Sequence, residues 1–466
     1  MGERSAYGVK KIFIFFIYSK INIFKRMKKS LIVLVFLALT VISCKEKNPW
    51  TDLIGDNLDN WEQLNGTAEY RLVNGSIEGI SVPNSPNSFL CTKEHYGDFI
   101  LEYDVMVDPV MNSGVQIRSH SLPEYNNGRV HGYQVEIDPE PRAWSGGIYD
   151  EARRMWLYPL DRNQEGRKAF VNGQFNHFRV EAIGNSIRTW CNGVPCADLI
   201  DDMTASGFIA LQVHGIGNDS TKVGKKVIFK NIRIITEDPG VYATPYNKEI
   251  PQNSYLVNAL SSREREEGWT LLFDGRTNDG WRSVDTTSFP SEGWLIERGE
   301  IKRTGPGKDI ITSGKFGDFE LILDFKYMNG ANSGIKYFVS GDRENNPHYN
   351  LGCEYQVIDG RAFPSLPGNE RIGGLYDIIS PASPRDNGPG IWNRARIVVK
   401  GSHVEHWLNN QMTLEYEREG EGWKALLAGS KFRDVPGFGE ADEGHILLQN
   451  HEGTGVSFRS IKIKEL

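Results

Sequence analysis

Apolar and polar residues alternate along most of the chain after residue 50, in short runs that Gly, Asn and Pro separate. A period of two places the apolar side chains on one face of a β-strand, and the separating residues are typical of turns. In the first half the pattern predicts strands over residues 99–107, 114–118, 178–190, 208–213 and 227–234. In the second half it predicts strands over residues 319–327, 334–339, 395–408, 445–449 and 457–463. A helical period is clear only over residues 261–267, so the predicted fold class is all-β, built as sandwiches.

The second half repeats the motifs of the first half in the same order. Gly97-Asp98-Phe99 returns 220 residues later as Gly317-Asp318-Phe319. The pairs that follow are Asn112-Ser113-Gly114 with Asn332-Ser333-Gly334, Gly146-Gly147-Ile148-Tyr149 with Gly373-Gly374-Leu375-Tyr376, and Leu211-Gln212-Val213-His214 with Leu448-Gln449-Asn450-His451. A period this long exceeds the roughly 20–50 residues of a solenoid repeat. We therefore predict two tandem jelly-roll β-sandwiches, over residues 51–237 and 266–466, joined by a Pro-containing linker over 238–265.

The first 44 residues predict an export signal. Met27-Lys28-Lys29 supplies positive charge, residues 31–42 are apolar, and Val41-Ile42-Ser43-Cys44 resembles the lipobox of bacterial lipoproteins, in which the Cys is acylated. We expect a signal peptide over residues 27–44 with lipid on Cys44, and an upstream extension from a misplaced start codon over residues 1–26. An uncleaved signal anchor is the alternative. The lysine after the lipobox favours the outer membrane by analogy with lipoprotein sorting, so the expected location is the cell envelope.

Composition excludes one class of partner and leaves another open. The net charge is −7, and no run of Lys or Arg lies beyond the N-terminal segment, which argues against a nucleic-acid surface. Aromatic residues make up 11% of the chain, enough both to fill two β cores and to provide rings on which sugars stack. Cys191 and Cys196 flank a predicted hairpin turn, where they form either a disulfide or two buried thiols.

One predicted strand in each half carries polar residues at alternate positions. Gln134, Glu136 and Asp138 share a face of the first strand, and Glu354 and Gln356 share a face of the second, with the amide and carboxylate exchanged. Because buried carboxylates are costly without partners, such a row indicates a ligand groove. The alternative is a solvated outer face of the sheet.

A histidine ends the same predicted strand in both halves. His214 shares a face with Gln212, and His451 shares a face with Gln449. Histidine acts as a general base near neutral pH, so both are candidate bases, along with Glu136 and Glu354 as candidate catalytic carboxylates. A structural role for the two histidines is the alternative.

Six further residues are candidates for binding a ligand at these grooves. Asn112 and Asn332 begin strands, although Asn and Gly also serve turns with positive φ. The other four follow Gly-Gly pairs or lie along the strands after the Asn-Ser-Gly motifs: Tyr149, Tyr376, Arg118 and Lys336. No metal motif is present, and no organic cofactor is indicated. A divalent cation held by carboxylates from separate loops stays open.

The ordered motifs resemble one protein family. Trp269-Thr-Leu-Leu-Phe-Asp-Gly-Arg, Glu354-Tyr-Gln-Val-Ile-Asp359 and Leu448-Gln-Asn-His451 look like the 3-keto-disaccharide hydrolase domain, also described as a domain of unknown function with a concanavalin-like fold. Gly132-Tyr-Gln-Val-Glu-Ile-Asp138 looks like the same family in the first half, although the start of that half lacks the Phe-Asp-Gly of 273–275. The resemblance implies concanavalin-like sandwiches that act on oxidised sugars.

Three functions fit these observations. The first is a hydrolase or lyase that cleaves 3-keto-glycosides by C2 proton abstraction, elimination and later hydration, with a saccharide as substrate and a separate sugar oxidoreductase as the partner that oxidises it. The second is a retaining glycosidase of the laminarinase type that uses Glu136 and Glu140, although Pro139 fits a central strand poorly. The third is a carbohydrate-binding lipoprotein without catalysis.

The lipid anchor predicts the behaviour of one variant. Cys44→Ser should release the protein from membranes or leave an unprocessed precursor, because acylation needs the thiol. Membrane fractionation and the mass of the mature N-terminus measure this. Unchanged processing and membrane partition would show that acylation is not the anchor.

Overall fold

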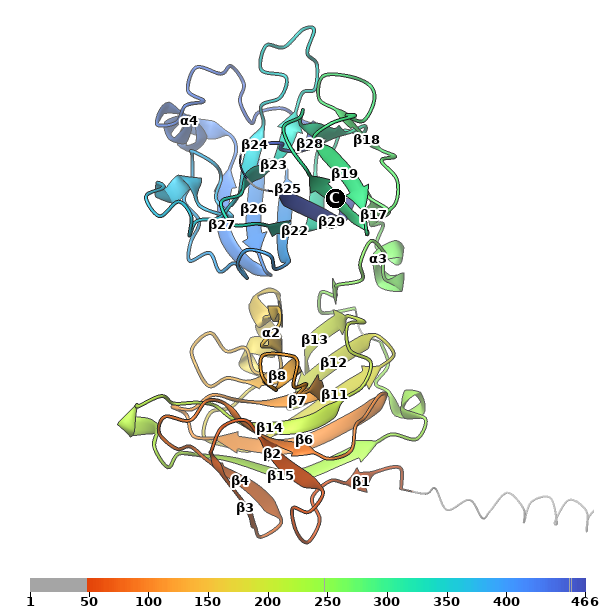
Figure 1. The fold of residues 1–466 in the computed structure, drawn as a ribbon, viewed down its shortest axis with the longest axis vertical. Helices are drawn as coiled ribbons and strands as arrows, with labels where there is room; N and C mark the ends of the chain where they lie inside the picture. The colour runs from red at the N-terminus through yellow and green to blue at the C-terminus, as the bar shows by residue number, and fades with distance from the viewer. Residues whose placement is uncertain (1–47, 247, 452, 454) are drawn as a thin grey trace, which may run out of the picture. The chain divides into compact units, whose positions relative to one another are not determined.

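The computed structural model describes residues 48–246, 248–451, 453 and 455–466 (Figure 1). The predicted extension over 1–26 and signal peptide over 27–44, with Cys44, lie outside the described residues. None of the helices within the described part of the chain has the length and apolar character needed to cross a membrane.

The first sandwich consists of two sheets whose facing sides share one apolar core. The larger sheet has the order β16-β13-β12-β11-β6-β15-β4-β3, with β1 also on β15, and the smaller sheet has the order β10-β9-β8-β7-β14-β5-β2. The strands of the larger sheet are β1 (Thr51–Asp52), β3 (Glu69–Val73), β4 (Ser76–Ile80), β6 (Phe99–Val107), β11 (Asn176–Ile183), β12 (Ser186–Cys191), β13 (Val194–Ile200), β15 (Lys226–Ile235) and β16 (Asn253–Ser254). Those of the smaller sheet are β2 (Trp61–Leu64), β5 (Ser88–Thr92), β7 (Ser113–His120), β8 (His131–Ile137), β9 (Ile148–Glu151), β10 (Met155–Tyr158) and β14 (Phe208–Val213).

The second sandwich repeats this strand order. Its larger sheet runs β19-β20-β29-β22-β25-β26-β27 with β17 on β29, and its smaller sheet runs β18-β21-β28-β23-β24. The larger sheet contains β17 (Thr270–Leu271), β19 (Trp294–Glu297), β20 (Glu300–Arg303), β22 (Phe319–Tyr327), β25 (Asn393–Lys400), β26 (His403–Leu408), β27 (Gln411–Glu417) and β29 (Val456–Glu465). The smaller sheet contains β18 (Trp281–Ser283), β21 (Ile310–Thr312), β23 (Asn332–Val339), β24 (Cys353–Ile358) and β28 (His445–Leu448). The predicted all-β fold of two tandem sandwiches is confirmed.

Helices are short and lie between strands. In the described residues the α-helices are α2 (Gln164–Lys168), α3 (Ser262–Glu266) and α4 (Gly420–Ala428), and the 3-10 helices are Leu160–Arg162, Ser220–Lys222, Pro239–Tyr242 and Gly368–Glu370. The sequence predicted α3 but missed α4. The N-cap residue of α4, Glu419, makes no capping hydrogen bond and its first turn contains two glycines, so the usual signals of a helix start are missing.

Two predicted strands are wrong, because each is a hairpin. Residues 178–190 span parts of β11 and β12, and residues 395–408 span parts of β25 and β26. Tight turns at Gly184 and Gly401, both with positive φ, reverse the chain there. Alternation continues through such a turn, so the pattern alone does not reveal the reversal.

Strand alternation sorts β8 into a core side and a polar side. Tyr133, Val135 and Ile137 lie in the apolar core of the first sandwich. Gln134 and Glu136 therefore point to the outer face of the smaller sheet. The thiols of Cys191 and Cys196 are buried in the same core and are unbridged.

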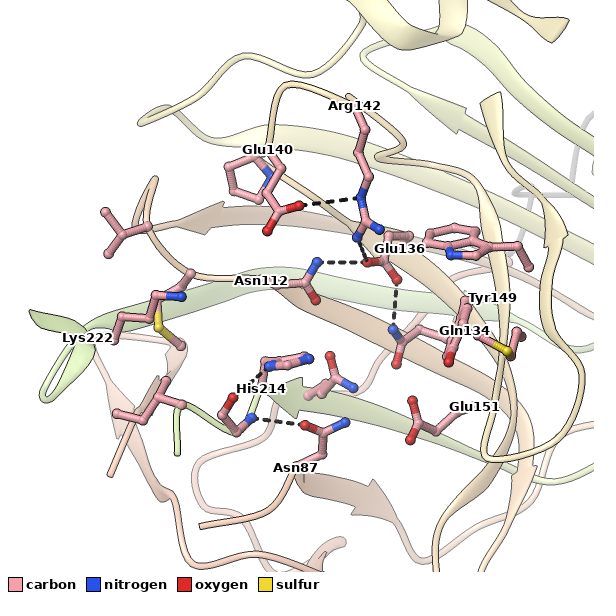
Figure 2. Close-up of a pocket in the computed structure, with 18 of the residues that line it drawn as sticks. Asn87, Asn112, Gln134, Glu136, Glu140, Arg142, Tyr149, Glu151, His214 and Lys222 are labelled. Atoms are coloured by element: carbon pink, nitrogen blue, oxygen red, sulfur yellow. Dashed lines mark hydrogen bonds and ion pairs between the residues drawn. The ribbon is translucent and has the colours of Figure 1, made fainter. Parts of the chain in front are cut away.

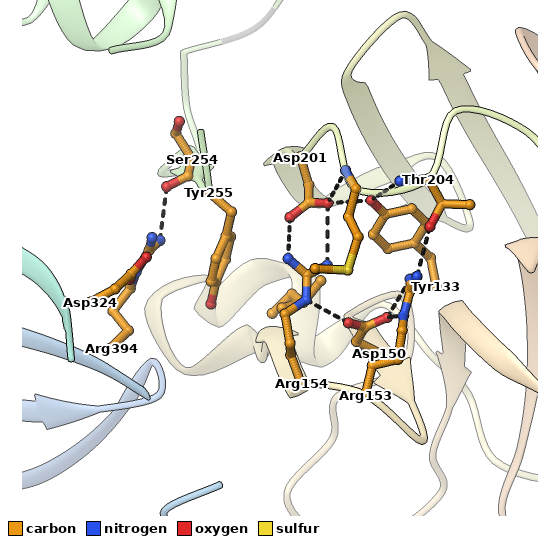
Figure 3. Close-up of polar contacts among 12 residues, drawn as sticks. Tyr133, Asp150, Arg153, Arg154, Asp201, Thr204, Ser254, Tyr255, Asp324 and Arg394 are labelled. Atoms are coloured by element: carbon orange, nitrogen blue, oxygen red, sulfur yellow. Dashed lines mark hydrogen bonds and ion pairs between the residues drawn. The ribbon is translucent and has the colours of Figure 1, made fainter. Parts of the chain in front are cut away.

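Strands β9 and β10 extend the smaller sheet of the first sandwich and have no counterpart among the described strands of the second sandwich; an ionic cluster holds this added hairpin in place (Figure 3). Arg154, in the turn between β9 and β10, makes 2.6 Å contacts with both Asp150 and Asp201. Arg153 contacts Asp150 at 2.7 Å and donates to the Thr204 hydroxyl at 2.7 Å. The cluster joins the β9–β10 hairpin to the segment that follows β13.

The linker is bound along its length. Its strand β16 pairs in parallel with β13, which extends the first sandwich. Arg394 donates to the Ser254 carbonyl at 2.8 Å, lies 3.7 Å from the centre of the Tyr255 ring and donates to Asp324 at 2.8 Å (Figure 3). Lys462 forms a buried ion pair with Glu264 of α3. These contacts attach the linker to strands of both halves.

Replacing Lys462 should destabilise the protein strongly. The Lys462 side chain is 1% exposed and that of Glu264 is 7% exposed, so Lys462→Ala leaves a buried carboxylate without its partner. We expect the free energy of unfolding to fall by about 3–5 kcal/mol, measured by urea denaturation. Lys464→Ala is the matched control, because Lys464 lies 3.8 Å from Glu267 and is partly exposed. It should cost less than about 1 kcal/mol, and equal losses in the two variants would contradict this account.

Candidate functional site

A cavity of about 650 Å³ opens on the outer face of the smaller sheet in the first sandwich (Figure 2). Seven of the residues predicted from the sequence line it: Asn112, Gln134, Glu136, Glu140, Tyr149, Gln212 and His214. They lie on β8, β9 and β14, in the turn before β7, in the loop after β8 and directly after β14. The structure thus gathers residues that are up to about a hundred positions apart in the chain.

A glycine makes room for the polar side chains. Gly114 lies opposite Glu136 in the β7–β8 pairing, and a Cβ on Gly114 would lie 2.4 Å from the Gln134 side chain. Neither Asn112 nor Gly114 has a positive φ, so the alternative explanation of the Asn-Ser-Gly motif is wrong. Glycine is needed here because the Gln134 side chain crosses the β7 backbone.

Glu136 is a buried carboxyl held by two amides. Asn112 Nδ2 donates to its Oε1 at 2.8 Å, Gln134 Nε2 donates to its Oε2 at 2.8 Å, and Arg142 lies 3.7 Å away. Burial raises the pKa of Glu136 to about 7, although the two amide hydrogen bonds and Arg142 act in the opposite direction. Near neutral pH this carboxyl is present in both protonation states, so it is suited to accept or donate a proton.

A chain of hydrogen bonds fixes the orientation of Gln134. Ser119 Oγ donates to Gln116 Oε1 at 2.8 Å, and Gln116 Nε2 donates to Gln134 Oε1 at 2.6 Å. Gln134 Nε2 is then directed at Glu136. The Gln116 amide is occupied at both ends by this chain.

His214 and Gln212 line the cavity, and their polar side-chain atoms can still form hydrogen bonds with a ligand. His214 follows β14 and is exposed, and its Nδ1 lies 2.8 Å from the Gly215 carbonyl oxygen. Because a carbonyl oxygen only accepts, Nδ1 carries the proton in the neutral ring and Nε2 carries the lone pair. The Gln212 amide nitrogen and oxygen are buried and have no hydrogen-bond partner among the described residues.

Two predicted residues do not reach the cavity. Arg118 is buried and donates to the Gly97 and Gly184 carbonyls at 2.8 and 2.7 Å, because a bulge after Ile117 breaks the alternation of β7. Asp138 lies beyond the end of β8, where Arg142 Nε donates to it at 2.5 Å. Both side chains hold loops in place.

The lining residues that the sequence did not identify include Arg129, Arg142, Glu151 and Trp156. Tyr149 packs edge-on against Trp156 with ring centres 5.1 Å apart, and Arg142 lies 5.2 Å from the same indole ring. Arg129 pairs with Glu151 at 3.0 Å. Most of these residues belong to loops or to the added hairpin, whose positions no periodicity indicates.

The second sandwich has a related polar group on the same face. Glu354 is 6% exposed and lies opposite Lys336 in the β23–β24 pairing, with Lys336 Nζ 4.0 Å from its Oε2. A Cβ on Gly334 would lie 2.2 Å from Glu354, so a glycine makes room here too. Burial raises the pKa of Glu354, against the lowering effect of Lys336, Lys431 and His451.

The remaining predicted residues of the second half lie around Glu354. Tyr376 donates its backbone N–H to the Glu354 carbonyl oxygen at 3.0 Å, and Lys431 lies 4.1 Å from the centre of its ring. Gln356 Oε1 and Gln449 Oε1 are buried without partners among the described residues. Asn332 begins β23 and is half-buried, and exposed His451 follows β28.

Two other kinds of site that the sequence left open, a metal site and a pair of catalytic carboxylates, are not formed by the described residues. Among the described residues no group of three or more His, Cys, Asp or Glu is placed to hold a metal ion. Glu140 lines the first cavity, but it is exposed and lies 3.6 Å from Arg142.

Comparisons with known proteins find one matching family and several similar proteins. One family model matches the chain twice, over residues 49–235 and 268–464, and is described as the 3-keto-alpha-glucoside-1,2-lyase-like domain. A curated 3-keto-disaccharide hydrolase of Bacteroides thetaiotaomicron is 37% identical over 256 residues, which cover 48% of this chain and 87% of that protein. A solved structure from Parabacteroides distasonis, provisionally described as a glycosyl hydrolase, is 31% identical over 45% of this chain and 99% of its own, with a TM-score of 0.42. The carbohydrate binding module CBM66 of Bacillus subtilis is 15% identical over 37% of this chain and 94% of its own, with a TM-score of 0.26.

The raised pKa of Glu136 predicts a pH-dependent stability. The carboxyl has a pKa of about 7 when folded and an ordinary value of 4.5, so its contribution to stability is complete below pH 4.5 and is lost as pH rises through 7. The loss is about 3 kcal/mol. Glu136→Gln removes this titration, so its free energy of unfolding relative to the unsubstituted protein should improve by about that amount between pH 4.5 and 8.

Chemical denaturation at several pH values measures the difference. Comparing the two proteins across pH, rather than at one pH, cancels the constant cost of the amide hydrogen bond that the substitution disturbs. A difference that stays flat between pH 4.5 and 8 would show that Glu136 titrates as an ordinary carboxyl.

Proposed function

The chain belongs to the family of 3-keto-alpha-glucoside-1,2-lyase-like domains, and on this premise we propose that it cleaves the glycosidic bond of 3-keto-glycosides. The proposed reaction begins with removal of the C2 proton, which the neighbouring C3 carbonyl acidifies. The C1 substituent then leaves by elimination, and later addition of water completes a net hydrolysis.

A buried carboxyl of raised pKa on the same outer face of each sandwich carries this proposal. Glu136 and Glu354 both lie there. Burial raises the pKa of Glu136 to about 7 and raises the pKa of Glu354 above its ordinary value, and such shifts are typical of carboxyls that transfer protons. A protonated carboxyl donates to the departing C1 oxygen, and a neutral histidine accepts the C2 proton. His214, with its Nε2 lone pair at the cavity, is that base in the first sandwich, and His451 is its counterpart in the second.

The other groups around these carboxyls suit a sugar. The unpartnered amide atoms of Gln212, Gln356 and Gln449 match hydroxyl groups, which both donate and accept hydrogen bonds. The edge formed by Tyr149 and Trp156 offers an apolar surface to a sugar ring. A saccharide is therefore the proposed substrate.

Two alternatives are less well supported. A site that only binds sugars gains nothing from a carboxyl whose burial costs stability, whereas proton transfer uses it. A retaining glycosidase needs two carboxyls about 5–5.5 Å apart. Of its two predicted carboxyls, Glu136 is buried, whereas Glu140 is exposed and lies 3.6 Å from Arg142.

The setting of the reaction follows from its chemistry. A 3-keto-glycoside arises only by oxidation of a sugar hydroxyl, so we propose that a separate sugar oxidoreductase supplies the substrate. We propose further that lipid on Cys44 holds the protein at the cell envelope, at the outer membrane.

Variants of the proposed base and acid test the function. Four variants are made separately in the full chain: His214→Ala and Glu136→Gln in the first sandwich, and His451→Ala and Glu354→Gln in the second. Their effects on turnover should differ between the two sandwiches. The two variants in the sandwich that catalyses should each slow release of monosaccharide from a 3-keto-disaccharide by about 100-fold or more. The two in the other sandwich should have smaller effects.

Exposed histidines of the opposite sheets provide matched controls. His177 pairs with Asp104 at 2.8 Å and His403 with Glu417 at 2.9 Å, so His177→Ala and His403→Ala should leave turnover unchanged. An unsubstituted protein that binds saccharides but turns over neither 3-keto nor ordinary disaccharides would support a binding protein instead. Turnover of ordinary disaccharides alone would support the glycosidase.

A further inference from the structure

We propose that Lys336 is a catalytic residue of the second sandwich, whose ammonium group binds the C3 oxygen of the substrate and stabilises the enolate. This inference rests on the proposed function and assigns the elimination to the second sandwich. It starts from the position of Lys336 on β23, directly opposite Glu354 and 6% exposed.

The first sandwich holds an amide at the corresponding position. Gln116 lies opposite Gln134 in the β7–β8 pairing, as Lys336 lies opposite Glu354 in the β23–β24 pairing. Gln116 accepts from Ser119 and donates to Gln134, so both ends of its amide are used. Gln116, the counterpart of Lys336, therefore has a structural role in the first sandwich.

The hydrogen-bonding capacity of Lys336 is largely unfilled. An ammonium group has three N–H donors. Among the described residues, Nζ has the Asn350 carbonyl oxygen at 3.4 Å and Glu354 Oε2 at 4.0 Å. A buried cation with so few partners is costly unless a ligand completes its hydrogen bonds.

The charges around Lys336 suit an anion that forms during a reaction. The carboxyl opposite Lys336 is Glu354, and the other charged or titratable groups that act on it are Asp309, Lys431 and His451. Burial shifts Glu354 towards its neutral form, which leaves the positive charge of Lys336 without full compensation. A developing oxyanion supplies that compensation at the transition state, where stabilisation accelerates the reaction.

The chemistry of an ammonium group selects the substrate atom. It donates and never accepts, so its natural partner is an oxygen that only accepts, such as a ketone or an enolate. Gln356 Oε1, buried without a partner on the same strand face as Glu354, accepts from a hydroxyl of the same sugar. The Lys336 ammonium group and Gln356 Oε1 together therefore match a sugar in which a ketone lies beside a hydroxyl.

The step balances with the groups present. The C2–H bond breaks and its proton passes to His451, while its electron pair forms a C2–C3 double bond and the carbonyl pair moves onto the oxygen beside Lys336. That pair then restores the C3 carbonyl, a C1–C2 double bond forms and the C1–O bond breaks. The departing oxygen takes the proton of Glu354. The products are an unsaturated keto-sugar and the free alcohol.

Lys336→Gln in the full chain tests the assignment, because the first sandwich carries Gln at this position. Two readouts are needed: kcat for a 3-keto-disaccharide, and exchange of the C2 proton for deuterium in D2O, followed by mass spectrometry of the substrate. We expect both to fall by at least 100-fold while KM changes by less than threefold. Lys302→Gln is the control, since Lys302 is a partly exposed residue of β20 that lies 3.6 Å from Glu297.

The outcomes separate this inference from the function on which it rests. Loss of both readouts in Lys336→Gln, with an unchanged control and an unchanged thermal midpoint, supports the assignment. Exchange and kcat that survive in Lys336→Gln overturn it, as does a raised KM with unchanged kcat. Absence of exchange and turnover in the unsubstituted chain overturns the proposed function and this assignment together.

Discussion

On the outer face of each smaller sheet, a polar side chain lies across a glycine of the neighbouring strand. Gln134 crosses Gly114 in the first sandwich, and Glu354 crosses Gly334 in the second. This contact keeps long polar side chains flat against the sheet and buried, instead of extended into water. Burial then shifts the protonation of Glu136 and Glu354, so the chemistry of both sites depends on a missing Cβ.

The duplicated frame supports two different polar networks. In the first sandwich a continuous series of amides ends on Glu136, and each amide fixes the next. In the second, a cation replaces the first amide and the carboxylate moves two residues along the strand to Glu354. Strand order and register are the same, so side-chain chemistry rather than architecture distinguishes the two sites.

The sequence predicted the direction of side chains correctly where strand alternation is regular, and it failed where a bulge or a loop interrupts that alternation. Alternation placed Gln134 and Glu136 on one face of β8, and the repeat located their counterparts. Arg118 was misplaced because a bulge reverses the direction of side chains after Ile117, and Phe338 has a positive φ at the matching point of the second sandwich. Arg142 and Trp156 were missed because a loop and an added hairpin bring them to the cavity, and their positions depend on tertiary contacts alone.

The pairing of β16 with β13 has a consequence for how the chain is divided. The repeat of the first half ends near residue 235, but the edge of its larger sheet is covered by residues 253–254. A fragment cut at the end of the repeat would expose the backbone N–H and C=O groups of β13 at an open edge, which is a template for aggregation. The unit that folds together is therefore longer than the sequence repeat. The segment between the repeats covers the edge of the first sandwich and so protects it from self-association.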